Sequence, residues 1–245
     1  MQQLMTEAPN GLKIGMVQTN TGMYEKHNNP LEGLRRHRQQ SLEVEAAGVE
    51  LILWPESGFN YVINAEQKNL KREVLGPMTT PLIFGGLRES SASEQERQIY
   101  NSAFLIDADG TVLGTYDKTY LLAFGETIPL GELFPWVYQL VPHIGRFTRG
   151  SHTRPLILNG IKFGILICYE DILPGFVSTV MEHEPHVLVN LTNDVWFGKT
   201  DEPKIHLALA IFRAVEFRRY LARSTNTGIS AIVDPTGRIV KQTGV

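Results

Sequence analysis

The chain has 245 residues, of which 42% are hydrophobic and 20% are charged, a balance typical of globular proteins and not of disordered or fibrous ones. Its formal net charge of -3 offers no basic surface for nucleic acid, and no stretch approaches the roughly 20 apolar residues that cross a bilayer. With a single cysteine the chain has no intrachain disulfide, so its redox compartment stays open.

The first half of the chain reads as strands alternating with helices. Asn29-Pro30 opens a helix that Gly48 ends, and Asp109-Gly110 makes the tight turn of a hairpin. Apolar runs and turn signals predict strands over residues 12–18, 49–54, 81–87, 99–107 and 111–116, and helices over 29–47 and 66–74.

Residues 118–151 show no regular strand or helix pattern and are rich in glycine, proline and aromatic residues, so we expect a long, structured loop region there. Long loops inside compact domains are usually functional. Alternation then resumes, which favours an α/β fold with mixed sheets. No linker or repeat divides the chain, so we expect one domain over residues 11–245 after a disordered leader of residues 1–10. The predicted strands here are 156–159, 161–167, 186–191, 224–226, 229–233 and 238–241, and the predicted helices are 175–182 and 204–220.

Three predicted strands end in a residue that can carry chemistry. Glu56 follows the run 51–55, Lys118 follows the run 113–117, and Cys168 follows the run 161–167. A thiol of ordinary pKa needs a base or a nearby cation before it attacks, so Glu56 as base and Lys118 as oxyanion partner would complete a nucleophilic site. Each residue alone also fits a plainer interpretation: a buried structural thiol, an exposed acid in a turn, and a surface lysine.

In this order the three residues resemble the Glu-Lys-Cys triad of the nitrilase superfamily, and within it the apolipoprotein N-acyltransferase family. The run from Lys118 to Leu130 is similar to that family's K-x-x-L-x-P-F-G-E-x-x-P stretch, with Ala123 where proline is usual. Cys168-Tyr169-Glu170 also matches, whereas the soluble amidases more often carry C-Y-D-x-R-F-P. Residues 191–198 and 222–230 resemble two further family motifs, S-N-D-A-W-F-G and R-A-T-N-N-G-x-S/T.

The resemblance implies an αββα sandwich, mixed sheets with helices outside, and a catalytic set of Glu56, Lys118 and Cys168. It further implies that Glu126 orients the lysine, that Tyr169 and Glu170 support the nucleophile, and that Asn101 and Trp196 bind substrate. A core aromatic under a loop is the other interpretation of Trp196. No cofactor is implied, and no metal site is predicted because Pro185 interrupts the only His-rich segment, residues 182–186.

The implied function moves an acyl chain from a phospholipid, through a thioester on the cysteine, to the N-terminal cysteine amine of a lipoprotein. In that family the domain is held at the extracytoplasmic face of the inner membrane by helices that this sequence lacks, and the domain continues beyond the point where this chain stops. We therefore expect a C-terminally truncated domain with weak or no transferase activity in isolation.

Two other hypotheses stay open. A cytoplasmic amidase that hydrolyses a small amide would use the same three residues, and the absence of a signal peptide and membrane segment from the sequence favours it. A binding module that kept the fold and lost the chemistry is disfavoured by the intact Glu, Lys and Cys set.

Overall fold

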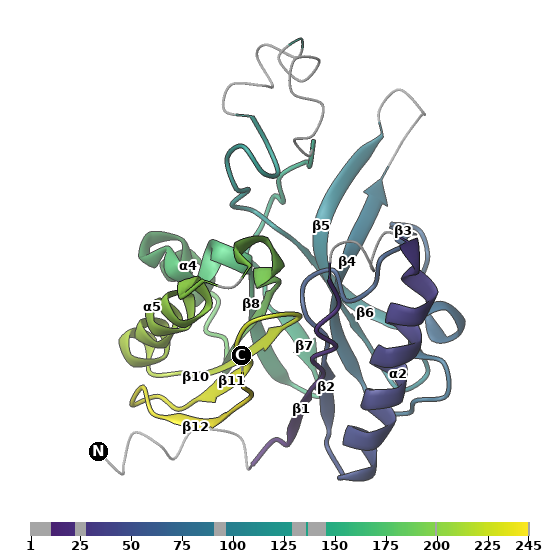
Figure 1. Cartoon of the computed structure of the whole chain (residues 1–245), viewed down its shortest axis with the longest axis horizontal. Helices are drawn as coiled ribbons and strands as arrows, with labels where there is room; N and C mark the ends of the chain where they lie inside the picture. Colours follow the sequence, from purple (N-terminus) through teal and green to yellow (C-terminus); the bar gives the residue numbers. More distant parts are fainter. Residues whose placement is uncertain are drawn as a thin grey trace.

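The computed structural model describes residues 11–22, 28–90, 97–128, 136, 146–198 and 200–244. Within these residues two six-stranded sheets pack face to face. Helix α2 (Pro30–Ala46) covers the outer face of the first sheet, and α4 (Pro174–Met181) and α5 (Glu202–Phe217) cover that of the second (Figure 1). The expected αββα sandwich with mixed sheets is confirmed. None of the helices in the described part combines the length and apolar character needed to cross a bilayer.

The first sheet begins with parallel strands and ends in hairpins. Strands β1, β2 and β4 are parallel, since α2 makes the crossover between the first two, and β5 and β6 continue antiparallel. Because β6 reverses twice relative to β4, it runs parallel to β2, and the two strands end at the same edge. The strands are β1 (Ile14–Met16), β2 (Leu51–Leu53), β3 (Val62–Asn64), β4 (Leu82–Ser90), β5 (Gln98–Ile106) and β6 (Val112–Asp117).

The second sheet has three parallel central strands, β8, β9 and β10, joined by α4 and α5, with antiparallel strands on either side. Parallel strands joined by helices place their carboxyl ends at one edge, where α/β folds carry their chemistry. Its strands are β7 (Leu156–Leu158), β8 (Ile161–Ile167), β9 (Val187–Thr192), β10 (Tyr220–Thr225), β11 (Ala231–Val233) and β12 (Ile239–Gln242).

Strand β8 shows how the sequence fills both sides of a sheet. Phe163, Ile165 and Ile167 point into the core between the two sheets, and Leu166 points into the layer under α4 and α5. At Gly164 a Cβ would lie 3.0 Å from Pro185 and Val180 side-chain atoms, so the glycine lets the helical layer approach closely. Apolar residues on both faces explain why this strand is a continuous hydrophobic run.

Three predicted elements differ from the structure in detail. The helix predicted over residues 66–74 is a loop followed by a π-helical turn at Lys71–Leu75, because the Asn64 and Asn69 side chains accept from the backbone N–H groups of Glu66 and Lys71 and hold the preceding segment in turns. The strand β3 just before it was not predicted.

The helix predicted to end at Tyr220 ends at Phe217. Arg218 takes a left-handed conformation with φ 54° and its N–H caps Ala214, which stops the helix. The strand expected over residues 224–226 consequently begins earlier, at Tyr220. The other predicted strands and helices of this part of the chain are present with ends shifted by a few residues.

Candidate active site

Cys168 lies immediately after β8, as the first residue of a short 3-10 helix, Cys168–Ile172. Its φ is 54°, a left-handed conformation that costs a non-glycine residue roughly 1–2 kcal/mol and is concentrated at functional sites. The Asn190 amide on β9 donates to the backbone carbonyl of Cys168 at 3.1 Å and so fixes the turn. The side chain is partly buried.

Lys118 follows β6 and is almost completely buried, at 2% exposure. Its Nζ lies 2.8 Å from Oε2 of Glu126 and 3.7 Å from Oε1 of Glu56. A buried ammonium needs such partners, because an isolated charge in the interior would be strongly destabilising. The lysine is therefore a core cation held between two carboxylates, and not the surface lysine of the plainer interpretation.

Glu56 follows β2 and Pro55 and is buried as well. The Asn101 amide on β5 donates to Oε1 of Glu56 and to Oε1 of Glu126, each at 2.8 Å, and so holds the two carboxylates side by side. Strand β4 packs directly against the backbone of Glu56, since a Cβ at Gly85 would lie 2.7 Å from the Glu56 Cα. The exposed-acid interpretation of Glu56 is thus wrong, and Asn101 contacts both acids beside Lys118.

The charges of these side chains act on the thiol. Burial and the Glu56 charge raise the pKa of Cys168, while Lys118 lowers it, and the net direction is upward. Burial lowers the pKa of Lys118, but Glu56, Cys168 and Glu126 outweigh it and raise that pKa above its ordinary value. At neutral pH the site therefore holds a charged lysine beside a protonated thiol, which needs a base before it can attack.

Glu170 ties the turn that begins at Cys168 to the loop that follows Lys118. Its carboxylate is fully buried and accepts from the Tyr116 hydroxyl, from the backbone N–H groups of Thr119 and Tyr120, and from that of Ile167. Burial raises its pKa to about 7, against the lowering effect of these donors. This side chain links Tyr116 on β6 of one sheet to Ile167 on β8 of the other, and it lies close enough to Lys118 for that charge to lower its pKa.

Tyr169 and Trp196, the two other aromatic residues expected at the site, have different surroundings from each other. The Tyr169 hydroxyl donates to Glu202, and its ring packs near Phe197 and His206, so it faces α5. Trp196 lies in the 3-10 helix Asp194–Phe197 and is 71% exposed, which overturns the interpretation of a core aromatic.

Several buried polar residues around the site were not singled out from the sequence as site residues. The Thr192 hydroxyl, at the end of β9, hydrogen-bonds to the Cys168 thiol and lowers its pKa. Asn226 donates to the Thr21 carbonyl and the Asn193 side chain, which joins the segment that follows β1 to the end of β9. In the sequence these residues are marked only as polar side chains within or directly after otherwise apolar strands. The fold is needed to show which of these side chains lie close together.

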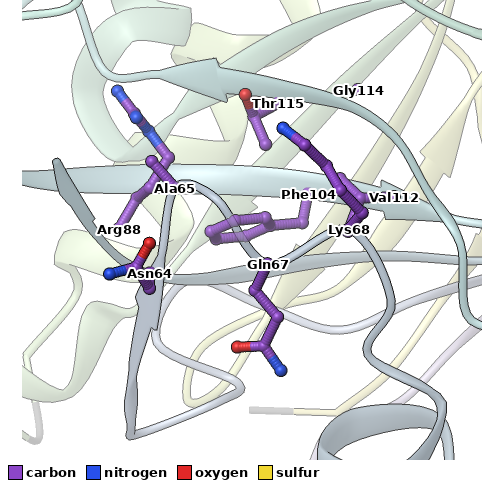
Figure 2. Close-up of a pocket in the computed structure, with 9 residues that line it drawn as sticks. All are labelled: Asn64, Ala65, Gln67, Lys68, Arg88, Phe104, Val112, Gly114 and Thr115. Carbon is purple, nitrogen blue, oxygen red and sulfur yellow. The ribbon is translucent and has the colours of Figure 1, made fainter.

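A pocket of about 200 Å³ lies elsewhere, over the first sheet. In Figure 2 the Phe104 ring forms its floor between the side chains of Arg88 and Lys68. Arg88 is already paired with Asp117, at 2.8 Å from Nε to Oδ1. Neither Cys168 nor its acidic and basic neighbours line this pocket, so it is separate from the candidate active site.

The sequence model of the carbon–nitrogen hydrolase family matches residues 13–244. Among curated proteins, the chain is similar to apolipoprotein N-acyltransferases of Bdellovibrio bacteriovorus (38% identical over 205 residues, 79% of this chain and 38% of the relative) and Geobacter metallireducens (34% over 236 residues, 93% and 44%). That of Bradyrhizobium diazoefficiens is 36% identical over 250 residues, 96% of this chain and 46% of the relative. The chain thus spans less than half the length of these curated relatives.

Two solved structures share the fold. A Glu-to-Gln variant of an amidase from Nesterenkonia sp. AN1, with acrylamide added to its active-site cysteine, superposes with a TM-score of 0.65 at 22% identity, over 96% of this chain and 89% of that one. A glutamine-dependent NAD+ synthetase from Acinetobacter baumannii gives a TM-score of 0.68 at 17% identity, over 95% of this chain and 43% of that one. At such low identity these likenesses show the architecture alone.

Proposed function

Because the chain belongs to the carbon–nitrogen hydrolase family, we propose that it is the catalytic domain of an apolipoprotein N-acyltransferase. The observation that carries the proposal is that the buried Lys118 ammonium lies 3.7 Å from the Glu56 carboxylate, and that both charges act on the pKa of the partly buried Cys168 thiol. The relatives' shared name supports N-acylation of a lipoprotein as the reaction. The donor would be a phospholipid, and the acceptor the N-terminal cysteine amine of the lipoprotein.

In the first half-reaction Glu56 takes the proton of the Cys168 thiol as the sulfur attacks the ester carbonyl carbon of the donor. Lys118 and the backbone N–H of Tyr169 stabilise the oxyanion, a contribution of about 2.7–4 kcal/mol per donor in comparable sites. The carbon–oxygen bond then breaks, and the departing alkoxide receives the proton from Glu56. A thioester on Cys168 and a lysophospholipid result.

In the second half-reaction the amine of the acceptor attacks the thioester carbon. Glu56 takes a proton from the attacking nitrogen, and Lys118 again holds the oxyanion. The carbon–sulfur bond breaks, the sulfur regains a proton from Glu56, and an amide is formed. Glu126 and Asn101 act by holding Lys118 and Glu56 in place throughout.

Exposed apolar side chains support a lipid donor. Tyr120, Leu122 and Phe124 follow Lys118 along the chain, and Trp196 follows β9; their exposures run from 40% to 71%. These segments leave the strand ends that carry the site, where a fatty acyl chain would enter. A phospholipid substrate would place the domain at a membrane surface, which we propose to be the extracytoplasmic face of the cell membrane.

The test is intact-mass spectrometry of the chain after incubation with p-nitrophenyl butyrate, an activated ester that needs no membrane, and with phospholipid in detergent micelles. We expect the activated ester to give a mass gain equal to its acyl group, removed by neutral hydroxylamine and absent from Cys168→Ala. The phospholipid should give little or no adduct on this chain in isolation. Lys118→Ala should slow the adduct, and Lys241→Ala, at an exposed position of β12, should not.

The amidase hypothesis makes the opposite forecast. Release of ammonia from small amides, with no lasting adduct and no transfer to an amine, would replace the proposal by amide hydrolysis. Transfer of the acyl group from Cys168 to a short peptide with an N-terminal cysteine would support N-acylation.

A further inference from the structure

His206, on α5, is a buried residue that the proposed mechanism does not use. Its Nε2 lies 2.9 Å from Oδ1 of Asp171 and its Nδ1 lies 3.2 Å from Oδ1 of Asp194. A neutral imidazole has one N–H and can donate to one carboxylate only, whereas the imidazolium donates from both nitrogens. Two carboxylates on opposite sides of the ring therefore fit the protonated form.

Arg223 completes the charge balance of this cluster. Its guanidinium is fully buried and donates to Oδ2 of Asp171 at 2.9 Å and to Oδ2 of Asp194 at 3.1 Å. Among the groups hydrogen-bonded to one another, two carboxylates thus face two cations when His206 is protonated, and the Glu202 carboxylate, 3.9 Å from Nδ1, adds a further negative charge beside the ring. With a neutral ring, one negative charge would be left uncompensated in the interior, which is strongly unfavourable.

The same atoms favour a hydrogen-bonded network over a metal site. Ligand-type atoms of Asp194, Glu202 and His206 lie within 4.8 Å of one another. The Glu202 carboxylate already accepts from Tyr169, and His206 already bonds to Asp194. A cation placed there would also meet the guanidinium of Arg223, which contacts Asp194.

The cluster connects the two turns of the candidate site. Asp171 belongs to the 3-10 helix that begins with Cys168, and Asp194 begins the 3-10 helix that contains Trp196. The Tyr169 ring, next to the nucleophile, lies 4.7 Å from the His206 ring, centroid to centroid. His206 is thus the one side chain of α5 that bonds to carboxylates of both turns, within the described part of the chain.

We propose that His206, as an imidazolium, is a positioning residue. It holds the nucleophile turn (Cys168–Ile172) against the Trp196 turn (Asp194–Phe197) and makes the reactivity of Cys168 dependent on pH. This inference rests on the proposed function only in taking Cys168 as the nucleophile. The ring acts through Asp171 and Asp194 and does not contact substrate.

The pH dependence follows from the groups around the ring. Burial lowers the pKa of His206, but the hydrogen bonds to Asp171 and Asp194 outweigh it and raise that pKa above 6.5. The stabilising contribution is then complete below about 6.5 and is lost as pH rises through the raised value. The charged and titratable groups that face the ring are Asp171 and Tyr169 from the nucleophile turn, Asp194 from the Trp196 turn, Glu202 from α5 itself and Arg223 from β10.

The first test is NMR of the full chain with 15N-labelled histidine, using His206→Gln to assign the ring signals. At pH 7 both His206 ring nitrogens should be protonated, and their signals should change only at a higher pH. The backbone amides of Asp171 and Asp194 should shift with the same midpoint. A neutral His206 ring at pH 6.5, or a titration that leaves those two amides unmoved, overturns the inference.

The second test is the rate at which iodoacetamide alkylates Cys168. His206→Gln should slow alkylation at pH 7 by roughly tenfold, the effect of losing one hydrogen bond to a charged group, and His183→Gln, a partly exposed control, should not. Adding Asp194→Asn to His206→Gln removes the unbalanced charge and should recover part of the rate. A double variant no faster than His206→Gln contradicts the charge-balance argument, even where the single variant is less stable.

These outcomes separate the two proposals. A protonated His206 with coupled amide shifts, in a chain that forms no acyl adduct, would remove the proposed function and keep the positioning role. An adduct that forms normally over a neutral His206 would do the reverse.

Discussion

At the residue scale, the site is organised around the sharing of one ammonium by two carboxylates. Lys118 contacts both Glu126 and Glu56, and Asn101 bridges the two acids from the other side. This arrangement keeps the lysine charged and the acids close together without exposing either. Burial, together with the charges of Glu56 and Glu126, outweighs the charge of Lys118 and raises the pKa of Cys168, so that the thiol is protonated at neutral pH.

Replacing Lys118 by alanine should suppress the reactivity of the thiol. The two carboxylates would remain buried without their cation, and their charge would raise the pKa of Cys168 further. We expect iodoacetamide alkylation at pH 7.5 to slow by roughly tenfold or more, the effect of losing one charged contact. An unchanged rate, against Lys241→Ala as the exposed control, would contradict the role given to Lys118.

Glu170 should leave a signature in the pH dependence of stability. Its pKa is raised to about 7 in the folded chain from an ordinary value of 4.5, so the folded state binds more protons between these limits and the free energy of unfolding falls as pH rises. From pH 5 to 7.5 this contribution amounts to about 2 kcal/mol. In Glu170→Gln that part of the slope should vanish, as measured by urea unfolding.

The neutral amide that this substitution introduces would place its own N–H groups against the N–H donors that now bind the carboxylate. The variant is therefore expected to be less stable at every pH, and the slope is the quantity to compare. A variant with the wild-type slope would show that Glu170 does not titrate in this range.

At the element scale, the short turns after β8 and α4 carry strain that regular elements do not. Glu184, after α4, has φ 52° and an exposed side chain. Its left-handed conformation therefore serves to turn the chain and not to place the side chain. Glu182, at the end of the same helix, has φ -58°. The pair offers a direct comparison of a strained and an unstrained position in one turn.

Glu184→Gly should raise the free energy of unfolding by about 1 kcal/mol, because glycine adopts a left-handed conformation without a Cβ clash. Glu182→Gly should lower it, since glycine loses more backbone entropy in a helical conformation. Chemical denaturation of both variants measures the difference. Equal effects of the two substitutions would refute the strain at residue 184.

Elements were predictable from the sequence where a local signal decided them, and not where distant groups did. Asn29-Pro30 and the apolar run before Cys168 set helix and strand starts correctly. The end of α5 was misplaced because a left-handed Arg218 has no glycine to mark it. The residues 66–74 carry a helical pattern, but asparagine side chains hold their first part in turns.

The triad residues were visible as ionisable groups directly after apolar strands. The His206 cluster was not, because its partners Asp171 and Arg223 lie far apart in sequence and a histidine inside a helix has no distinctive spacing. Several expectations concern residues outside the described part, among them the leader of residues 1–10 and much of the loop 118–151.

At the scale of the whole molecule, the site exists only when the two sheets are docked. The first sheet and its loops supply Glu56, Asn101, Lys118 and Glu126, and the second supplies Cys168. Asn226 fastens the sheets at this edge: its amide donates to Thr21 at 2.8 Å and to Asn193 at 3.0 Å, and its oxygen accepts from the Thr21 N–H.

Asn226→Asp should therefore loosen the edge that holds the site. The substitution removes two donors and places a charge against the oxygens of Thr21 and Asn193, a loss of about 2–4 kcal/mol of stability for a buried group. Thermal unfolding measures this loss, with Asn28→Asp at an exposed position as control. Equal melting temperatures for the two variants would contradict the role of Asn226 in holding the two sheets together.

The left-handed backbone at Cys168 has a consequence for anyone who tries to make this protein sturdier. The position is occupied by a residue that the proposed reaction requires and that the left-handed conformation disfavours, so Cys168→Gly should melt about 2–4 °C above Cys168→Ala. Selection for thermal stability alone would thus replace Cys168 by glycine. A cysteine at a position that favours glycine is therefore what the proposed reaction, and not stability, would select.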